Sequence, residues 1–315
     1  RFWGIPLPIF EDEDGNYEVI GSKEELESRT GQSFDDIHKD DLEGVSITHS
    51  KTGKTMHRVP FTADVWFDSG CASFASHYNE GLSFDEIIEK YYPIDWITES
   101  EDQIRGWFSS LFNVGWVVTG QQPYRQVLYY KFVMDKYGQK MSKSKGNGIS
   151  GTEALERWGS DKTRYYLLYK RPPEEQVNFD PDEFSSVDGF FNTLQNLFRY
   201  ANAYLDAHPL KHPRMTVTTM PVEDQWVLHR LHTMIKSYVQ SMNRYQMNEA
   251  VKALEDFVVR DFSKTYLKLI KDRTDERDEQ LLVVFNEVLK KILLLLGPVS
   301  PFTAELLYQE GSFEQ

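Results

Sequence analysis

The second half of the chain is dominated by apolar residues that recur at spacings of three and four. From about residue 185 to residue 296, four such segments follow one another, and each would place its apolar side chains on one face of a helix. The first segment, for example, carries Phe190, Leu194 and Leu197. Helices that each have one apolar face bury those faces against one another, so the pattern predicts a helix bundle over residues 185–315.

Residues 63–150 show a different pattern, in which β-rich apolar runs alternate with helical spacing. Tyr92–Ile97 predicts a short buried strand, residues 102–118 predict a helix, and Gln126–Met134 predicts a second strand. A strand, a helix and a strand in this order form a βαβ unit, whose two strands are expected to be parallel. This part of the chain is therefore predicted to be an α/β layer.

Two further segments complete the predicted domains. Residues 1–62 are polar and rich in turns, with a β-hairpin around Ser50–Lys54, and are expected to form a small β-rich insert without an independent core. Residues 151–184 are expected to form a helical linker, whose helices are capped by Thr152 and Asp161. The predicted fold class is thus α/β plus all-α.

Composition narrows the class of protein. The chain is 40% hydrophobic and 27% charged, which is typical of a globular protein, and its 315 residues suit two domains or one large domain with an appendage. A single cysteine excludes a disulfide scaffold and a cysteine-based zinc ribbon. No apolar run is long enough to span a membrane and no signal peptide is visible, so a cytoplasmic protein without a membrane partner is expected.

Charge and the first residues add two expectations. The formal net charge of −14 argues against nucleic-acid binding over the whole surface, although it allows a local basic site. The chain begins Arg1-Phe2-Trp3-Gly4 without a methionine, which predicts a piece of a longer polypeptide.

The segment with the clearest chemical signal is Lys140–Asn147. Three lysines alternate with hydroxyl side chains, and glycines flank the run at Gly138, Gly146 and Gly148. Ammonium groups suit phosphate oxygens, and glycines allow a loop to close over a ligand. The segment lacks the spacing of a P-loop. It predicts a phosphate-binding loop, and the alternative is an ordinary solvated basic loop.

The run Lys140-Met141-Ser142-Lys143-Ser144 is identical to the signature loop of class I aminoacyl-tRNA synthetases. Four other segments resemble blocks of the isoleucine, valine and leucine members in the order of the family: Arg1–Ile9, Val19–Leu26, Asp64–Gly70 and Asp102–Phe108. Together they extend over essentially the whole chain. The stretch around Gly21-Ser22 is most similar to isoleucyl-tRNA synthetases, with valine and leucine enzymes as alternatives.

The resemblance implies a fold and an activity. Residues 63–150 would be the second half of a nucleotide-binding, doubly wound parallel sheet, and the bundle would bind the anticodon stem of tRNA. Such enzymes join isoleucine to ATP, with Mg²⁺ on the nucleotide, and transfer the acyl group to tRNA. The partners implied are therefore isoleucine, ATP, tRNA and the missing amino-terminal half of the enzyme. No protein nucleophile is needed, because catalysis rests on positioning and charge neutralisation.

The resemblance also implies roles for individual residues. Lys140 and Lys143 would be catalytic, and the residues that contact ATP or the adenylate would be Glu99, Asp102, Gln103, Lys143 and Ser144. Trp66 and Asp68 would line the substrate pocket. Helix capping is the alternative for Asp102, and core packing is the alternative for Trp66. Gln103 has no evident capping role, which favours ligand contact, while Trp107 and Phe108 are expected in the core.

Several positions depart from the family pattern. The His-x-Gly-His signature is absent from these 315 residues, and Tyr130-Lys131 replaces a His-Gly pair near the adenine. The family usually has glycine at the position of Ser100. Many relatives have zinc-binding cysteines around Ser50–Lys54, whereas this chain has none there, and we predict no zinc and no other metal ligand set.

A basic stripe is predicted on one helix of the bundle. Its residues are Arg260, Lys264, Lys268, Lys271 and Arg273, at spacings close to one helical turn. The stripe suggests contact with tRNA phosphates, and the alternative is an ordinary solvated face. Two hypotheses remain for the function of the chain. It is either part of a synthetase, which the Lys140–Ser144 loop favours, or a non-catalytic synthetase-like module that binds tRNA or a protein.

Overall fold

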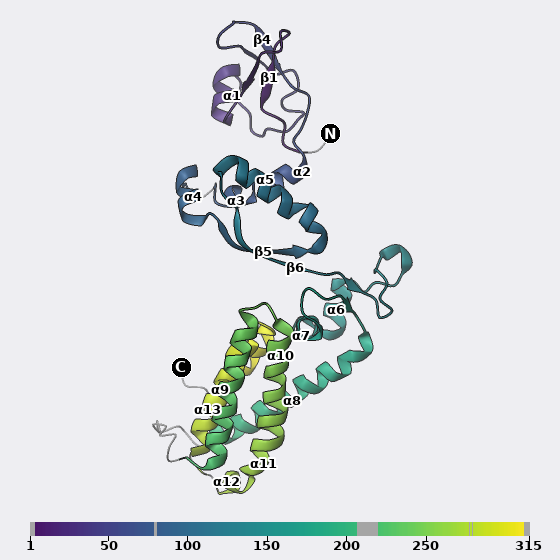
Figure 1. Cartoon of the computed structure of the whole chain (residues 1–315), viewed down its shortest axis with the longest axis vertical. Coiled ribbons are helices and arrows are strands. Elements are labelled where there is room, and N and C mark those ends of the chain that lie inside the picture. Colours follow the sequence, from purple (N-terminus) through teal and green to yellow (C-terminus); the bar gives the residue numbers. More distant parts are fainter. Residues whose placement is uncertain (1–3, 79–80, 207–219, 277, 279, 312–315) are drawn as a thin grey trace. The chain divides into compact units, whose positions relative to one another are not determined.

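The computed structural model describes residues 4–78, 81–206, 220–276, 278 and 280–311 (Figure 1). The side chain of Lys143 also lies outside the described part. The chain divides into two compact units, residues 1–128 and residues 129–315, and each is described by itself. Across the described residues, no helix has both the length and the apolar character needed to cross a membrane.

The first unit begins with a small antiparallel sheet. Its strands are β1 (Ile9–Glu11), β2 (Tyr17–Val19), β3 (Ser46–Thr48) and β4 (Thr55–Arg58), in the order β2-β1-β4-β3. The predicted hairpin is confirmed, since β3 and β4 are antiparallel neighbours with Ile47 opposite Met56.

The expectation that this segment has no core of its own is wrong. Helix α1 (Lys23–Thr30) and the sheet enclose a separate buried cluster: Phe10, Ile20, Leu26, Phe34, Leu42, Val45, Ile47 and Met56. Ser22 caps α1 by accepting a hydrogen bond from the Glu25 N–H at 3.1 Å. The alternation along the short strands is sufficient to direct one side chain in two toward this cluster.

The rest of the first unit is an α/β layer. It contains α2 (Val65–Gly70), α3 (Ala72–Ala75), α4 (Phe84–Tyr91), β5 (Ile94–Ser100), the 3₁₀ turn η2 (Glu101–Arg105), α5 (Trp107–Thr119) and β6 (Tyr124–Tyr130). Strands β5 and β6 form a two-stranded sheet. The strand–helix–strand order is confirmed, but β5 was predicted to be buried and only its Ile97 is.

Two glycines bring α5 close to its neighbours. A Cβ on Gly70 of α2 would lie 2.9 Å from the carbonyl oxygen of Ser110, and a Cβ on Gly115 would lie 2.8 Å from the ring of Pro123. No larger residue fits at either contact without a shift of backbone. The close approach fixes α2 against α5, and therefore places Trp66 and Asp68 beside the start of α5.

The second unit begins with a short parallel ladder. Strand β7 (Val133–Met134) pairs with β8 (Val177–Asn178), so the single strand predicted over Gln126–Met134 is interrupted after Tyr130. At the interruption, the N–H of Lys131 donates to the carbonyl of Pro173 at 3.1 Å.

Helices α6 (Gly151–Trp158) and α7 (Ser160–Lys170) follow, but both predicted caps are wrong. Ser150, not Thr152, caps α6 by accepting from the Glu153 N–H at 3.1 Å. Asp161 lies inside the first turn of α7, where it is buried and accepts a hydrogen bond from the N–H of Thr303. Its carboxylate thus joins α7 to the last helix and does not cap α7.

The helix bundle is confirmed. It comprises α8 (Phe184–Asp206), α9 (Val222–Met242), α10 (Met247–Asp256), the π-helix η6 (Phe257–Tyr266), α11 (Leu267–Leu269), α12 (Lys271–Asp275), α13 (Gln280–Leu296) and α14 (Pro301–Gln309). Figure 1 shows α9, α10 and α13 running side by side. Their shared core is rich in aromatic rings, including the fully buried Phe198, Phe262 and Phe285.

A buried ion cluster joins four segments of the bundle. Asp224, which is fully buried on α9, accepts from Tyr266 Oη at 2.7 Å and from both terminal nitrogens of Arg273 at 2.8 and 2.9 Å. Arg273 also donates to Glu223 at 3.0 Å and to Asp278 at 2.7 Å. The hydrogen bonds from Arg273 to Asp224 raise the pKa of the guanidinium, and burial raises the pKa of Tyr266.

We predict that Asp224→Ala lowers the free energy of unfolding by about 3–5 kcal/mol, because the change leaves a buried guanidinium and a buried hydroxyl without their acceptor. Urea denaturation followed by circular dichroism measures the effect. The matched control is Asp272→Ala, since Asp272 is exposed on α12 and its side chain has no comparable contact. A loss of equal size in both variants would contradict the role of the cluster.

Candidate functional site

The lysine-rich loop extends from Asp135 to Ile149 in the second unit. Two of its residues, Met141 and Ile149, are partly buried and pack against the core of the bundle unit. Between them, Ser144 and Lys145 are exposed, and residues 143–145 form a short 3₁₀ turn, η3 (Lys143–Lys145). The loop is therefore attached at its base and open to solvent at its tip.

Lys140 and Lys143, the predicted catalytic lysines, both belong to this loop. Lys140 is exposed, and its ammonium lies 4.7 Å from the centre of the Phe132 ring. The backbone of Lys143 opens η3, whereas its side chain is outside the described part. The described loop residues carry their positive charge into solvent, where an anionic ligand can reach it.

Asp135 organises the turn that precedes the lysines. One of its carboxylate oxygens accepts from the N–H groups of Tyr137 at 3.0 Å and Gln139 at 2.8 Å, and the other accepts from Asn147 Nδ2 at 2.8 Å. The hydrogen bond from Gln139, followed by that from Asn147, lowers the pKa of Asp135. The turn at Asp135–Gly138 is readable from the sequence, but the contacts of Asp135 and Asn147 were not predicted, although an asparagine directly after Gly146 is a signal for such a role.

The first unit contains the other predicted site residues. Glu99 is half-buried and is the penultimate residue of β5, so it lies at the carboxyl end of that strand as expected. Asp102 is exposed and does not cap a helix: its carboxylate accepts hydrogen bonds from the Ser100 hydroxyl and from Gln103 Nε2.

The expectation that Gln103 has no capping role is wrong. Its side-chain oxygen accepts from the N–H of Trp107 at 3.0 Å, at the beginning of α5. The helical conformation is interrupted at Gly106, where η2 ends and α5 begins. The first N–H groups of α5 have no acceptor within the helix, and Gln103 supplies one. The sequence shows the residues but not this break.

Trp66 and Asp68 lie on α2 next to the same turn. Trp66 is 44% exposed, so its ring is not a core side chain of this unit. A Cβ on Gly106 would lie 3.1 Å from the edge of the Trp66 ring, which places the indole against η2. Asp68 Oδ1 is buried and has no hydrogen-bond partner among the described residues. By contrast, Phe108 is buried in the core of the layer, as predicted.

The structure thus brings together the predicted residues of each unit. Trp66, Gln103 and Asp102 gather around η2, with Asp68 on the adjacent helix and Glu99 at the end of the strand that leads into η2. The lysines and Ser144 form a second group on the loop of the other unit.

Polar contacts close the turns around Asp14 and Ser50–Lys54, where no zinc was predicted. Lys54 pairs with Asp14, and His49 Nδ1 lies 2.5 Å from the hydroxyl of Thr52. Nowhere in the described ranges do three His, Cys, Asp or Glu side chains form a group able to hold a metal ion. The absence of zinc stays a prediction.

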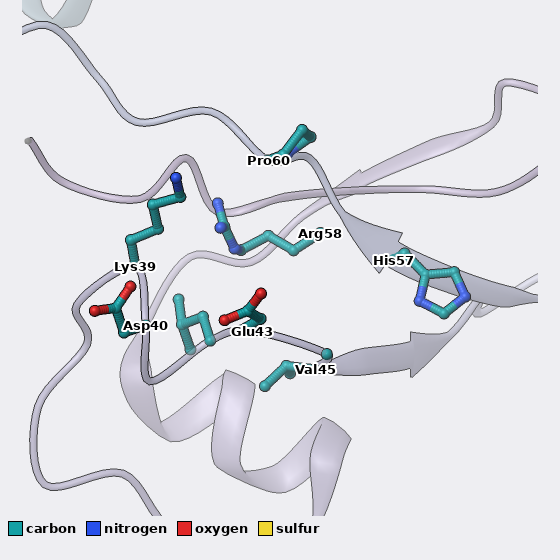
Figure 2. A pocket seen from close by; sticks show the side chains of 9 residues that line it. Lys39, Asp40, Glu43, Val45, His57, Arg58 and Pro60 are labelled. Atoms are coloured by element: carbon teal, nitrogen blue, oxygen red, sulfur yellow. The ribbon is translucent and has the colours of Figure 1, made fainter. Parts of the chain in front are cut away.

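A hollow of about 340 Å³ lies beside the small sheet, and none of the predicted site residues belongs to its lining (Figure 2). Its polar lining has both signs of charge, from Lys39, Asp40, Glu43, His57 and Arg58. Arg58 Nε is buried without a hydrogen-bond partner among the described atoms, and burial lowers the pKa of the Arg58 guanidinium. The mixed lining gives no preference for one kind of ligand.

The predicted basic stripe does not lie on one helix. Arg260 and Lys264 belong to the π-helix, Lys268 to α11 and Lys271 to α12, although all four are exposed. Arg260 also pairs with Asp256 at 3.0 Å. Arg273 is not part of any basic surface, because it is only 17% exposed and belongs to the ion cluster around Asp224. The π-helix changes the angular spacing, so residues four apart no longer lie one above the other as they do in an α-helix.

Comparison with known proteins identifies the class. Residues 1–180 match the family described as tRNA synthetases class I (I, L, M and V), and residues 224–315 match the anticodon-binding domain of tRNA ligases. The chain therefore belongs to the class I aminoacyl-tRNA synthetases, a family of ligases. The predicted resemblance is confirmed.

Within this class the chain is similar to isoleucine–tRNA ligases. It is 35% identical to the isoleucine–tRNA ligase of Methanothrix thermoacetophila over 98% of its own length, and it spans 30% of the length of that relative. Similar structures include the LeuRS of Agrobacterium radiobacter K84 in a ternary complex with tRNA and LeuAMS, with 17% identity, a TM-score of 0.76, and coverage of 100% of this chain and 40% of that one.

A second similar structure is the Mycobacterium tuberculosis methionyl-tRNA synthetase bound by methionyl-adenylate. The identity is 19% and the TM-score 0.62, over 94% of this chain and 55% of the other. At these identities the two structures support the fold and nothing finer.

Glu18 on β2 connects this strand to Arg29 on α1 and to Ser50 in the turn between β3 and β4. It accepts from the hydroxyl and the N–H of Ser50, the latter at 2.8 Å, and from Arg29 at 2.6 Å. These hydrogen bonds, that of the Ser50 hydroxyl first, lower the pKa of Glu18 to about 2 from 4.5.

We predict that Glu18 stabilises the first unit fully above pH 4.5 and that this contribution is lost as the pH falls toward 2, because the folded state holds the charged form. Titration of the carboxyl carbon by NMR measures the midpoint, and Ser50→Ala is expected to raise it. Glu13, exposed in the neighbouring turn, serves as the control, since Ser50→Ala removes none of its contacts. A Glu18 midpoint that stays unchanged in Ser50→Ala would show that the hydroxyl does not cause the shift.

Proposed function

We propose that this chain is part of an isoleucine–tRNA ligase, and that its lysine loop acts in the ATP-dependent activation of isoleucine. The observation that carries the proposal is the exposed, glycine-flanked loop with the Lys140–Ser144 run, held at its base by Met141 and Ile149. The 35% identity with an isoleucine–tRNA ligase supports the choice of amino acid.

In the proposed reaction the carboxylate oxygen of isoleucine bonds to the α-phosphorus of ATP, and the bond to the departing pyrophosphate breaks. Negative charge accumulates on the phosphate oxygens during this step. Lys143, assisted by Lys140, would neutralise that charge, and Ser144 would hold a phosphate oxygen by hydrogen bonding. Mg²⁺ would accompany the nucleotide as a charge carrier between the phosphates.

The residues around η2 would bind the other parts of the adenylate. Glu99 and Asp102 offer acceptors to hydroxyl or ammonium groups, and Gln103 keeps its amide nitrogen free of its capping contact. Trp66 would form an apolar wall of the substrate pocket, with Asp68 beside it. Strands β5 and β6 would then belong to the second half of a larger, doubly wound parallel sheet.

The helix bundle would bind tRNA. The match of residues 224–315 to an anticodon-binding domain supports this assignment, and the exposed residues Arg260, Lys264, Lys268 and Lys271 supply cations for phosphate contacts. We propose these four as the tRNA-binding residues, within a division of the chain into segments 1–62, 63–150, 151–184 and 185–315.

A second candidate is a non-catalytic module that binds tRNA or a protein. It is favoured by one feature of the sequence, that Tyr130-Lys131 stands where the resembled family has a His-Gly pair. Valine and leucine remain alternative amino acids for the ligase, because much of the specificity pocket would come from the amino-terminal half.

We predict isoleucine-dependent exchange of pyrophosphate into ATP when the chain is combined with the amino-terminal half that carries His-x-Gly-His. Lys143→Ala is expected to lower kcat about 10²–10³-fold, as expected for loss of one transition-state charge partner. The control is Lys145→Ala, which changes the same loop beside the proposed site and should retain most of the rate.

The outcomes separate the candidates. Exchange with isoleucine but not with valine or leucine supports the proposal. If exchange depends on valine or leucine instead, the ligase function stands and that amino acid is the substrate in place of isoleucine. The absence of exchange in the combined protein favours the binding module. An unchanged rate in Lys143→Ala would contradict the role of that lysine.

A further prediction concerns tRNA binding by the bundle. For each of Lys268→Ala and Lys271→Ala, the slope of log Kd against log salt concentration is expected to fall by about 1 if the lysine contacts a phosphate. Lys236→Ala is the control, since Lys236 is exposed on α9 outside the proposed surface. Equal slopes in all variants would remove the four residues from the tRNA-binding surface.

A further inference from the structure

The side chain of Asn147 contacts three other positions of the lysine loop. Its Nδ2 donates to Asp135 Oδ2 at 2.8 Å, on the entering side of the loop. Its Oδ1 accepts from the N–H of Ser142 at 3.1 Å, in the middle of the lysine run. A longer contact, 3.4 Å, joins Nδ2 to the carbonyl oxygen of Lys140. One amide therefore ties the entrance, the centre and the exit of the loop together.

The loop needs such a tie, because its main chain is otherwise permissive. Gly138 and Gly146 adopt positive φ angles of 76° and 63°, and no atoms lie close to the position of a Cβ on Gly146. A loop of this kind loses much conformational entropy when it binds a ligand. Fixing the backbone before binding reduces that loss and leaves only the lysine side chains to be ordered.

The tie lies at the border between the apolar base and the charged tip. A hollow of about 230 Å³ beside it is lined by Asp135, Met141, Asn147, Ile149 and Phe179, among others. Met141 packs against the core, and the next residue, Ser142, donates its N–H to Asn147. The main chain at the start of the lysine run is therefore held at two adjacent residues.

We propose that Asp135 and Asn147 are positioning residues, whose hydrogen-bonded chain Asp135–Asn147–Ser142 presets the lysine loop for a polyphosphate ligand. The proposal deepens the function proposed above and rests on it for the identity of the ligand. It assigns no chemical step to either residue. Their effect reaches the phosphates through Lys140 and Lys143.

The donor and acceptor pattern of the pair allows a swap experiment. In Asp135→Asn, the side-chain oxygen can still accept from Tyr137 and Gln139, but two NH₂ groups then face each other and the contact with Asn147 is lost. In Asn147→Asp, two carboxylates face each other. The double variant Asp135→Asn/Asn147→Asp restores the contact between the two side chains with reversed polarity and keeps an acceptor for the Ser142 N–H, while the long 3.4 Å contact with the Lys140 carbonyl is lost.

Hydrogen exchange of the loop amides in the whole chain tests whether the pair fixes the loop. Each single variant is expected to speed exchange of the Ser142 amide about tenfold, and the double variant is expected to recover most of the protection. Asn192→Ala, an exposed asparagine on α8, is the matched control for loss of an amide and should leave the loop unchanged. Equal exchange in the single variants and the unsubstituted chain would overturn the proposal.

Pyrophosphate exchange by the combined protein tests whether this fixing serves the reaction. We expect the single variants to lower kcat about tenfold with a smaller change in KM for ATP, because preset lysines act mainly on the charge of the transition state. The double variant should recover most of kcat, because it restores the contact between the two side chains. Lowered kcat without recovery in the double variant would overturn the positioning role.

The two levels of the proposal fail separately. If the unsubstituted combined protein shows no pyrophosphate exchange, the proposed function is overturned, while hydrogen exchange still decides whether Asp135 and Asn147 fix the loop. If pyrophosphate exchange occurs but the variants match the unsubstituted protein in both measurements, the ligase function stands and the positioning role is overturned.

Discussion

The attachment of a polar loop to an apolar core is the contact on which the candidate site of the second unit depends. Met141 and Ile149 pack against the bundle core, while Lys140, Ser144 and Lys145 are exposed. The partial burial of the Met141 and Ile149 side chains offsets part of the conformational entropy that is lost when this glycine-containing segment is ordered. Because the core consists of helices whose apolar faces interlock, the base of the loop inherits their rigidity.

The first unit positions its residues by close backbone approach. Gly70 and Gly115 let α5 contact α2 and Pro123 without intervening side chains, and the break at Gly106 starts α5 at a fixed place. Gln103 then satisfies an N–H group that this break exposes. Polar residues near η2 are thus held by helix geometry, which is independent of the loop that carries the lysines.

Hydrogen bonds and ion pairs between charged or polar side chains join separate segments in both units. Lys54 pairs with Asp14, and Ser50 donates to Glu18, so polar side chains join the turns of the small sheet. In the bundle, Asp224 and Arg273 connect α9 to α12 across a buried position where apolar packing is the more common solution. Such buried charges fix one arrangement, because each partner is costly to leave alone.

Periodicity and short motifs determined much of this protein from sequence alone. The spacing of residues such as Leu194 and Leu197 defined the bundle, because helical burial is a local property repeated along the chain. The run Lys140–Ser144 defined the family for the same reason, as its identity is written in consecutive residues. Only the tertiary structure decided the roles of Arg273, Asp161, Gln103 and Asn147. Each of these side chains has several possible partners, and the partner it meets depends on how distant or interrupted segments pack, which no local pattern encodes.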